Sequence, residues 1–114
     1  KTFGEDIIVK RFDKDTAYRA HQDTILADLV VPEELKCPFW HQYGHLTKGN
    51  TMELHEHPTD EIYIVYSGQL MVTVGDEQEA VEAKDVITIP PNVKHTMTAL
   101  SEEAVWAAFW WEHI

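Results

Sequence analysis

The sequence contains a single cysteine, Cys37, in 114 residues, and this scarcity limits how the chain can be stabilised. One cysteine cannot form an internal disulfide, so no disulfide framework holds the fold together. We interpret Cys37 as a buried or bystander thiol rather than a catalytic nucleophile. The fold must therefore depend on a hydrophobic core, and a chain of this length has room for one domain with such a core.

Basic residues are also scarce. Nine lysines and arginines stand against twenty acidic residues, which gives a formal net charge of −11. Because binding to phosphates needs an excess of positive side chains, this composition argues against a nucleic-acid partner. We interpret the acidic excess as a contribution to solubility, with a specific basic partner as the alternative.

Long apolar runs are missing as well. The sequence has no run of 18 apolar residues, and the apolar segment 104–111 is too short to cross a bilayer. The first six residues, Lys1–Asp6, do not resemble a signal peptide. We therefore expect a cytoplasmic protein with no membrane partner.

What the sequence does contain is a series of short β-rich segments. They occupy residues 24–31, 39–47, 62–66, 69–75, 81–89, 95–100 and 104–111, and Ile7–Val9 forms a further strand-like patch. Turn signals at Ser67-Gly68 and at 101–103 predict hairpins, and Gly75-Asp76 begins another turn. Short strands with turns every eight to twelve residues predict an antiparallel barrel or jelly roll.

Two intervals do not fit the β pattern. Residues 13–23 have no apolar periodicity, which predicts a loop or a short turn of helix. Residues 33–36 are the interval most compatible with a helix, and Pro38 would end it.

The final β-rich segment, 104–111, is apolar on both faces. A strand of this kind needs cover on each side, from the barrel interior and from either another sheet or another subunit. This pattern predicts a homodimer; the alternative is a monomer in which N-terminal residues cover the outer side.

The chemistry-bearing residues gather in one stretch of the chain. His55 and His57 lie at i and i+2, on the same face of an extended segment, so their two imidazoles can converge on one ion. Glu61 follows a Pro-Thr-Asp turn that can return a carboxylate oxygen to the same ion. A fourth ligand must come from elsewhere, and the next histidine is His95, just after a turn at 90–92.

This stretch resembles the first motif of the cupin family, Gly-x5-His-x-His-x3-Glu-x6-Gly. All five fixed positions match, and they are Gly49, His55, His57, Glu61 and Gly68. The resemblance implies a single cupin domain over residues 1–114, an all-β antiparallel double-stranded β-helix that is also called a jelly-roll barrel. Its first motif spans 49–68 and its second motif spans 84–99.

The second motif, Gly-x5-Pro-x-Gly-x2-His-x3-Asn, is matched less completely. Pro90 and His95 stand in place, whereas Lys84, Asn92 and Ala99 replace the usual Gly, Gly and Asn. Asparagine tolerates positive φ better than other non-glycine residues, so we expect the turn at Asn92 to form. Ala99, in contrast, removes a polar group from the expected pocket.

The resemblance implies that one divalent transition metal binds to four residues, His55, His57, Glu61 and His95. Three imidazoles and one carboxylate suit Fe, Mn, Ni, Co, Cu or Zn. A six-coordinate ion with four protein ligands would keep two positions open for a substrate. The alternative is a metal-free cupin whose histidines bind an anionic ligand directly.

The resemblance also implies a ligand pocket beside the metal. Its expected lining residues are Trp40, Gln42, Met52 and Met97, of which Gln42 lies thirteen residues before the first metal ligand. Such a pocket is mostly apolar and suits a small or aromatic organic molecule. On the other face of the same segment, His41 and His45 remain candidates for alternative ligands.

Tyr63 lies two residues after Glu61 and should share its face of the strand. We identify Tyr63 as the candidate catalytic residue, a proton donor or hydrogen-bonding group, with a core aromatic as the alternative. The favoured function is a dioxygenase-type oxidoreductase acting on a small organic acid, phenol or enol. A redox-neutral lyase, isomerase or decarboxylase and a non-catalytic binding module are the alternatives, because the cupin fold hosts all of these classes.

Overall fold

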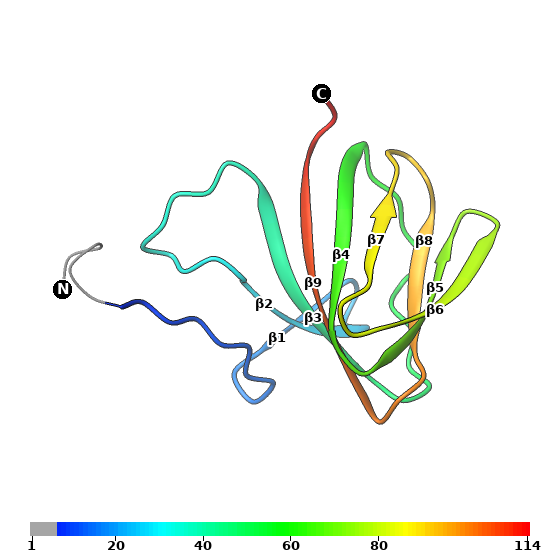
Figure 1. The fold of residues 1–114 in the computed structure, drawn as a ribbon, viewed down its shortest axis with the longest axis horizontal. Helices are drawn as coiled ribbons and strands as arrows, with labels where there is room; N and C mark the ends of the chain where they lie inside the picture. Colours follow the sequence, from blue (N-terminus) through cyan, green and yellow to red (C-terminus); the bar gives the residue numbers. More distant parts are fainter. Residues whose placement is uncertain (1–6) are drawn as a thin grey trace.

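The computed structural model of the protein describes residues 7–114, and its regular secondary structure there consists of nine β-strands (Figure 1). They are β1 (Tyr18–Ala20), β2 (Ile25–Asp28), β3 (Trp40–Thr47), β4 (Thr59–Ser67), β5 (Gln69–Val74), β6 (Glu77–Glu82), β7 (Val86–Ile89), β8 (His95–Ala99) and β9 (Glu103–Glu112). Within this described part of the chain, no helix is long and apolar enough to cross a membrane. Lys1–Asp6, the residues interpreted above as unlike a signal peptide, lie outside the described residues.

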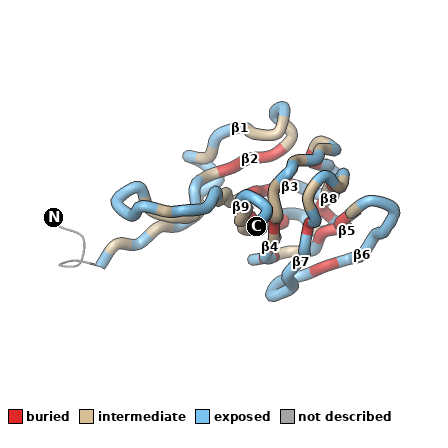
Figure 2. The backbone as a smooth tube through the Cα atoms, turned by 90° about the horizontal axis from the view of Figure 1, so that it is seen from above, coloured by how far each residue is buried: buried red, intermediate tan, exposed pale blue. Residues whose placement is uncertain are grey.

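The strands form two antiparallel sheets. The larger sheet has the order β1-β2-β3-β9-β4-β7, and the smaller has the order β6-β5-β8. Residues from both sheets form one core, in which Leu70, Met97 and Trp106 are almost completely buried. Figure 2 shows buried segments on strands of both sheets. The all-β antiparallel jelly roll predicted from the sequence is therefore confirmed.

Two turns predicted as hairpins, at Ser67-Gly68 and at 101–103, instead carry the chain from one sheet to the other. β4 pairs with β7 and β9, whereas β5 pairs with β6 and β8, so the chain changes sheets at Gly68. Gly68 has a φ of +77°, and a side chain at this position would collide with the backbone oxygen of Glu103. The segment at 101–103 also joins strands of different sheets, β8 and β9, so the hairpin predicted there is wrong. Residues 83–85 join β6 and β7 across the two sheets in the same way. The turn at Gly75-Asp76 does join paired strands, β5 and β6.

The N-terminal third contains a strand where a loop or helical turn was predicted. β1 lies within 13–23 and pairs with β2, while residues 7–9 form no strand. Residues 33–36 form no helix; the Leu35 N–H donates to the Pro32 carbonyl at 3.0 Å to close a turn. The five residues between Pro32 and Pro38 are too few to nucleate a helix.

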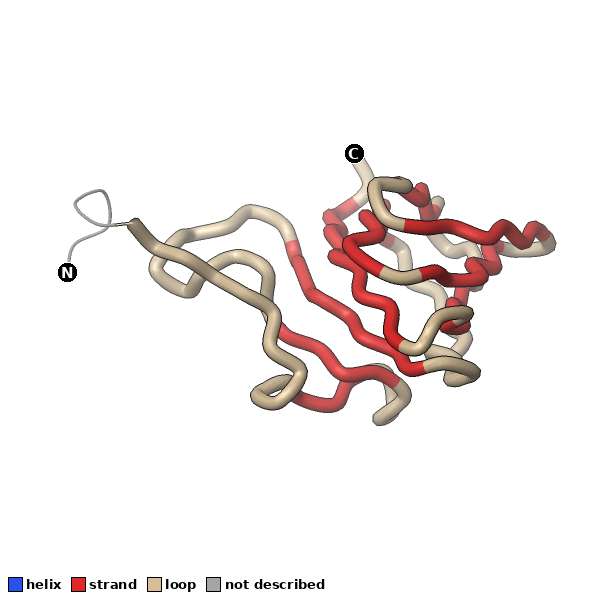
Figure 3. The backbone as a smooth tube through the Cα atoms, turned by 60° about the horizontal axis from the view of Figure 1, so that its bottom comes forward, coloured by secondary structure: helices blue, strands red, loops and turns tan. Residues whose placement is uncertain are grey.

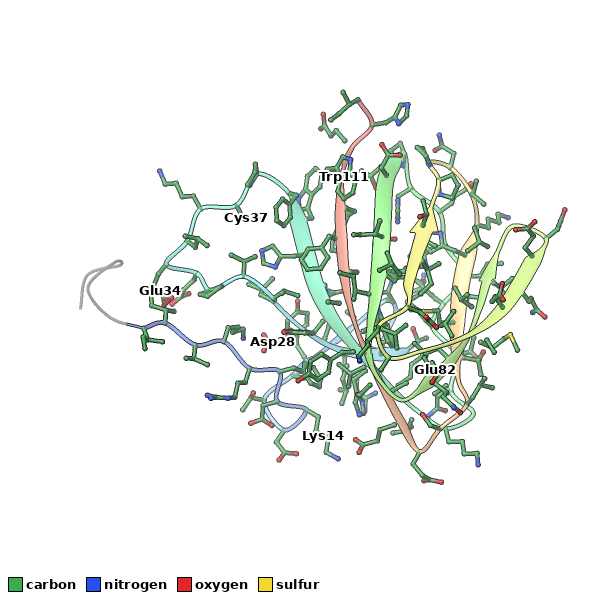
Figure 4. The ribbon with its side chains drawn as sticks, viewed as in Figure 1. Lys14, Asp28, Glu34, Cys37, Glu82 and Trp111 are labelled. Atoms are coloured by element: carbon green, nitrogen blue, oxygen red, sulfur yellow. The ribbon has the colours of Figure 1, made fainter. Side chains whose placement is uncertain are left out.

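The loop between β2 and β3 and the N-terminal segment lie together at one end of the molecule, away from the smaller sheet (Figures 1 and 3). Cys37 lies on this loop, where its thiol contacts the carbonyl oxygen of Phe39 at 3.2 Å (Figure 4). Phe12 of the N-terminal segment packs against Tyr43 and His45 of β3, with ring centroids 5.6 and 5.9 Å apart. The segment therefore covers the outer face of β3.

Hydrogen bonds to His41 link the start of this loop to β3. Its Nδ1 accepts hydrogen bonds from the backbone N–H groups of Val30 and Val31, at 3.0 and 3.2 Å. Burial lowers the pKa of His41 below its ordinary value of 6.5. Because the folded protein binds this proton less readily than the unfolded chain, the contact stabilises the fold above pH 6.5 and is lost as the pH falls below that value.

We therefore expect the amides of Val30 and Val31 to lose protection from hydrogen exchange on acidification from about pH 7.5 to about pH 5.5, after correction for the intrinsic exchange rate. The His41→Phe variant keeps an aromatic ring but has no acceptor, so its protection should be low at both pH values. Exchange measured residue by residue tests this expectation, and protection of the two amides that does not change with pH would contradict it.

Candidate metal centre

Three imidazoles and one carboxylate converge between the two sheets. The ligating nitrogens of His55, His57 and His95 all lie within 4.8 Å of one another. Oε1 of Glu61 lies 3.0 Å from Nε2 of His57 and 3.3 Å from Nε2 of His95. The structure thus brings together all four residues that the sequence indicated as ligands.

Backbone pairing places these side chains. Residues 51–57 do not form the regular extended strand expected from the sequence, but His55 pairs with His95 of β8 through reciprocal N–H···O bonds of 3.2 and 2.9 Å. The Asn92 N–H donates to the carbonyl oxygen of His57 at 2.7 Å, and Asn92 has the positive φ, 61°, that the sequence predicted. Glu61 comes from β4, so both sheets contribute to the centre.

Each imidazole is oriented by a partner of its Nδ1 atom. The Nδ1–H of His55 donates to the carbonyl oxygen of Glu53 at 2.9 Å, and that of His95 donates to the carbonyl oxygen of Val93 at 2.8 Å. Because a carbonyl only accepts, each ring carries a hydrogen on Nδ1, and in the neutral ring Nε2 then carries the lone pair. Nδ1 of His57 is hydrogen-bonded to a hydroxyl group, at 2.7 Å. Partners of this kind orient histidines for metal binding.

The lone pairs of the histidine nitrogens and of the Glu61 carboxylate are suited to binding a cation. Nε2 of His95 is buried and has no hydrogen-bond partner among the described residues. The Glu61 carboxylate that faces it is itself only 5% exposed and offers a second set of lone pairs. A buried polar atom left without a partner costs about 1–3 kcal/mol, and a divalent ion held by these atoms would remove that cost. The four residues therefore form a potential metal-binding site.

Burial also prepares His55 for binding. Loss of solvation is the largest cause that lowers its pKa below the ordinary value of 6.5, and the neighbouring imidazoles of His95 and His21 lower it further. The hydrogen bond to the Glu53 backbone and the charge of Glu61 act in the opposite direction without reversing the shift. His55 is therefore neutral at neutral pH, which is the form that binds metals.

A cavity of about 310 Å³ is lined by three of the four residues, His55, His57 and Glu61. Among the residues predicted to line it, the structure places Trp40, Gln42 and Met52 in the wall, together with Tyr63. Met97 does not line the cavity and lies in the hydrophobic core, with 0% of its surface exposed.

Other lining residues were missed or left open by the sequence analysis: His21, Thr59, Trp106, Ala108 and Trp110. The last three share one face of β9, so period-two alternation could have grouped them once that face was known. No sequence signal marked His21, which lies in an irregular turn.

The two alternative ligand candidates lie away from the centre. Nδ1 of His41 is occupied by the loop after β2, and Nε2 of His45 lies 2.9 Å from Oε1 of Glu103. That hydrogen bond from His45 is the largest cause that lowers the pKa of Glu103, ahead of Lys14. Both histidines therefore contribute to contacts of β3 rather than to the metal centre.

Tyr63 is buried next to Glu61, with 2% of its surface exposed. Burial raises the pKa of Tyr63 well above its ordinary value of 10.0, and the negative charge of Glu61 and a hydrogen bond to that carboxylate raise it further. The phenol therefore stays protonated at neutral pH. It can donate a proton or a hydrogen bond but is a poor proton acceptor.

Comparison with known proteins identifies the same region. The family model described as Cupin domain matches residues 42–111. An uncharacterized protein of Streptomyces coelicolor is 36% identical over 58 residues, which cover 51% of this chain and 55% of that protein. The alignment thus covers little more than half of either protein.

Solved structures resemble this fold over most of the chain. A cupin 2 conserved barrel domain protein of Salinispora arenicola has a TM-score of 0.82 at 20% identity, covering 95% of this chain and 91% of its own. A protein of Photorhabdus luminescens has a TM-score of 0.80 at 22% identity, covering 94% and 89%. A predicted oxalate decarboxylase of Thermotoga maritima has a TM-score of 0.69 at 16% identity, covering 78% and 81%. At these identities the likeness is one of fold.

Proposed function

This chain belongs to the cupin family, and on that premise we propose that it is a metal-dependent enzyme acting on a small organic molecule. Its cofactor would be one divalent transition metal, Fe, Mn, Ni, Co, Cu or Zn, held by His55, His57, Glu61 and His95. The observation that carries the proposal is the buried Nε2 of His95, which has a lone pair, a facing carboxylate and no hydrogen-bond partner among the described residues. A small-molecule ligand would occupy the adjoining cavity.

For the reaction we propose a dioxygenase-type oxidation of a small organic acid, phenol or enol, in which dioxygen is the co-substrate and both of its atoms enter the product. A bound metal would supply Lewis acidity and, if redox active, electron transfer. The cavity wall supports this chemistry, because the apolar side chains of Trp40, Met52 and Trp106 exclude water from the reacting group. Gln42 offers an amide that can orient the ligand.

The test combines metal analysis of protein from its native host with aerobic and anaerobic turnover on a panel of enolisable acids and flavonoids. We expect oxygen consumption in equal amounts to substrate loss, and no turnover without oxygen. If turnover continues without oxygen, the dioxygenase proposal is wrong and the reaction is redox-neutral. If the protein binds a panel compound tightly but does not turn it over with any of the metals, it is a binding module and not an enzyme.

A redox-neutral lyase, isomerase or decarboxylase is the second candidate, and Tyr63 is the observation that favours it. Its protonated phenol lies beside Glu61, so it is positioned to deliver a proton to an enolate-like group in the cavity. One similar structure is named a predicted oxalate decarboxylase, which agrees with this reaction class.

We also propose that a second copy of this chain covers the outer face of the larger sheet. The N-terminal segment covers β3, but Ile64, Tyr66 and Val86 of β4 and β7 are exposed beside the apolar outer side of β9. An apolar sheet face of this kind is typical of a subunit interface.

Light scattering at micromolar concentration should therefore give twice the chain mass of 13.2 kDa. Ile64→Arg places a charge in the centre of the proposed interface and should yield monomers. Gln78→Arg adds the same charge on β6 of the smaller sheet and serves as the control. A wild-type protein with the mass of one chain would refute the dimer.

The remaining expectations on partners and location rest on the sequence. The net charge of −11 argues against a nucleic-acid partner, and the apolar runs are too short to suggest a membrane partner. A cytoplasmic location stays a prediction.

A further inference from the structure

A third imidazole lines the cavity beside those of His55 and His57, and it comes from a part of the chain that the family match does not cover. His21 lies in the turn between β1 and β2, whereas the match begins at residue 42. Its ring centroid is 4.5 Å from that of His55, and its Nδ1 is 3.3 Å from Oε1 of Glu53. The hairpin of β1 and β2 thus adds a histidine next to the metal centre, and the segment between β3 and β4 supplies the carboxylate of Glu53 beside it.

The backbone holds this histidine in a conformation that few side chains adopt. His21, Gln22 and Asp23 have φ values of 53°, 56° and 64°. These values lie in the left-handed region, which glycine adopts at a lower free-energy cost than other residues. Thr24 secures the turn: its hydroxyl donates to the His21 carbonyl at 2.6 Å and accepts from the Glu53 N–H at 3.0 Å. One threonine therefore positions both members of the His21–Glu53 pair.

The Glu53 carboxylate favours one tautomer of His21. Its Oε1 lies 3.3 Å from Nδ1 of His21, so its negative charge favours the hydrogen of a neutral ring on that nitrogen and leaves the lone pair on Nε2. A lone pair accepts a hydrogen bond from a hydroxyl group. No lysine or arginine among the described residues lines the cavity, so the polar part of a ligand has few partners there besides His21 and Gln42.

From this geometry we propose that His21, oriented by Glu53, is a specificity-determining residue that accepts a hydrogen bond from a hydroxyl group of the ligand. The site would then select small hydroxylated acids or enols that carry one oxygen group for the metal and a second hydroxyl beside it. This inference rests on the proposed metal centre.

His21, Glu53 and His55 also stand close enough to hold a cation of their own. The hydrogen bonds argue against that use, because Nδ1 of His55 donates to the Glu53 carbonyl and its Nε2 is the atom free for the first centre. A shared His55 would have no atom left for a second ion.

The experiment uses the Co²⁺-loaded full chain and two probes, lactate and glycerate. Both have the same 2-hydroxy acid group for the metal, and glycerate has one further hydroxyl on carbon 3. The visible absorption of Co²⁺ reports binding of each probe without any turnover. Since one hydrogen bond is at stake, we expect wild-type protein to bind glycerate about 10-fold more tightly than lactate.

His21→Asn is the informative variant, because asparagine tolerates the left-handed backbone while its shorter side chain withdraws the imidazole. It should bind lactate as wild type does and lose most of the preference for glycerate. His113→Asn is the matched control: His113 pairs with Asp60 at 2.9 Å, is 65% exposed and does not line the cavity. The control should keep the full preference.

Several results would overturn the inference. One is a wild-type protein that binds Co²⁺ but prefers neither probe, and another is a preference that survives His21→Asn. Equal weakening of both probes would show that His21 only shapes the wall, and two Co²⁺ ions per chain, one of them lost in His21→Asn, would make it a metal ligand. A wild-type protein that retains no Co²⁺ would refute the metal centre itself, and the inference would fall with it.

Discussion

Replacement of His95 by alanine is expected to lower turnover by about 100-fold or more while part of the metal remains bound. The change leaves His55, His57 and Glu61, a set of two imidazoles and one carboxylate that still binds divalent metals. It removes the candidate ligand whose Nε2 has no partner in the described protein, and it would open one more position on a bound ion. The altered coordination geometry of the metal, rather than the fraction of chains that hold a metal, should then limit turnover.

Metal content per chain and turnover, measured on the same preparation, test this expectation. Because His95 is completely buried, its removal also leaves a cavity, so the thermal midpoint of the metal-free variant must be measured to show that it is folded. His113→Asn, an exposed histidine outside the cavity, is the control for both quantities. Turnover that falls only in proportion to metal content would contradict the role assigned to His95.

The convergence of the candidate ligands could be predicted from the sequence because much of its information is local. His55, His57 and Glu61 stand within seven consecutive residues, and this spacing keeps two imidazoles and a carboxylate close, while backbone pairing with His95 and Asn92 completes their placement. His95 was the next histidine along the chain, and the positive φ of Asn92 followed from what asparagine tolerates.

Strand pairing could not be predicted in the same way. A turn signal such as Ser67-Gly68 says that the chain changes direction, but it does not say whether the next strand pairs with the last one or joins the opposite sheet. The deciding contact is distant in sequence, because Gly68 lies against the backbone of Glu103. In a jelly roll most such turns cross between sheets, and the sequence gives no local sign of it.

The cavity wall was only partly predictable for a related reason. The alternation of side chains along a strand groups residues by face. It does not say which face points inward, or whether an inward side chain lies at the cavity wall or deeper in the core. Met97 is two residues from His95 and yet lies wholly in the core. Gly44 has no side chain that would collide with Trp106, so that indole can pack directly over β3, a contact between strands far apart in the sequence.

If Tyr63 donates a proton, as the redox-neutral reaction requires, its replacement by phenylalanine is expected to lower turnover by about 100-fold or more with metal content unchanged, because the change removes the donor and keeps the ring. The ring packs against His95 and Trp106, with centroids 6.1 and 6.4 Å away, and phenylalanine preserves these contacts. A loss of turnover without loss of metal would therefore assign the effect to the hydroxyl.

The pH dependence sharpens this test. Burial first, and then Glu61, raises the pKa of Tyr63 well above 10.0, so the phenol of the wild-type enzyme should remain a donor throughout the neutral and mildly alkaline range. The ratio of wild-type to Tyr63→Phe turnover should accordingly be constant from about pH 6 to about pH 9. Tyr66→Phe, on the same strand but 72% exposed, is the matched control and should leave turnover unchanged. If Tyr63→Phe turns over substrate as fast as Tyr66→Phe, then Tyr63 is a packing residue, and the redox-neutral reaction loses its proton donor.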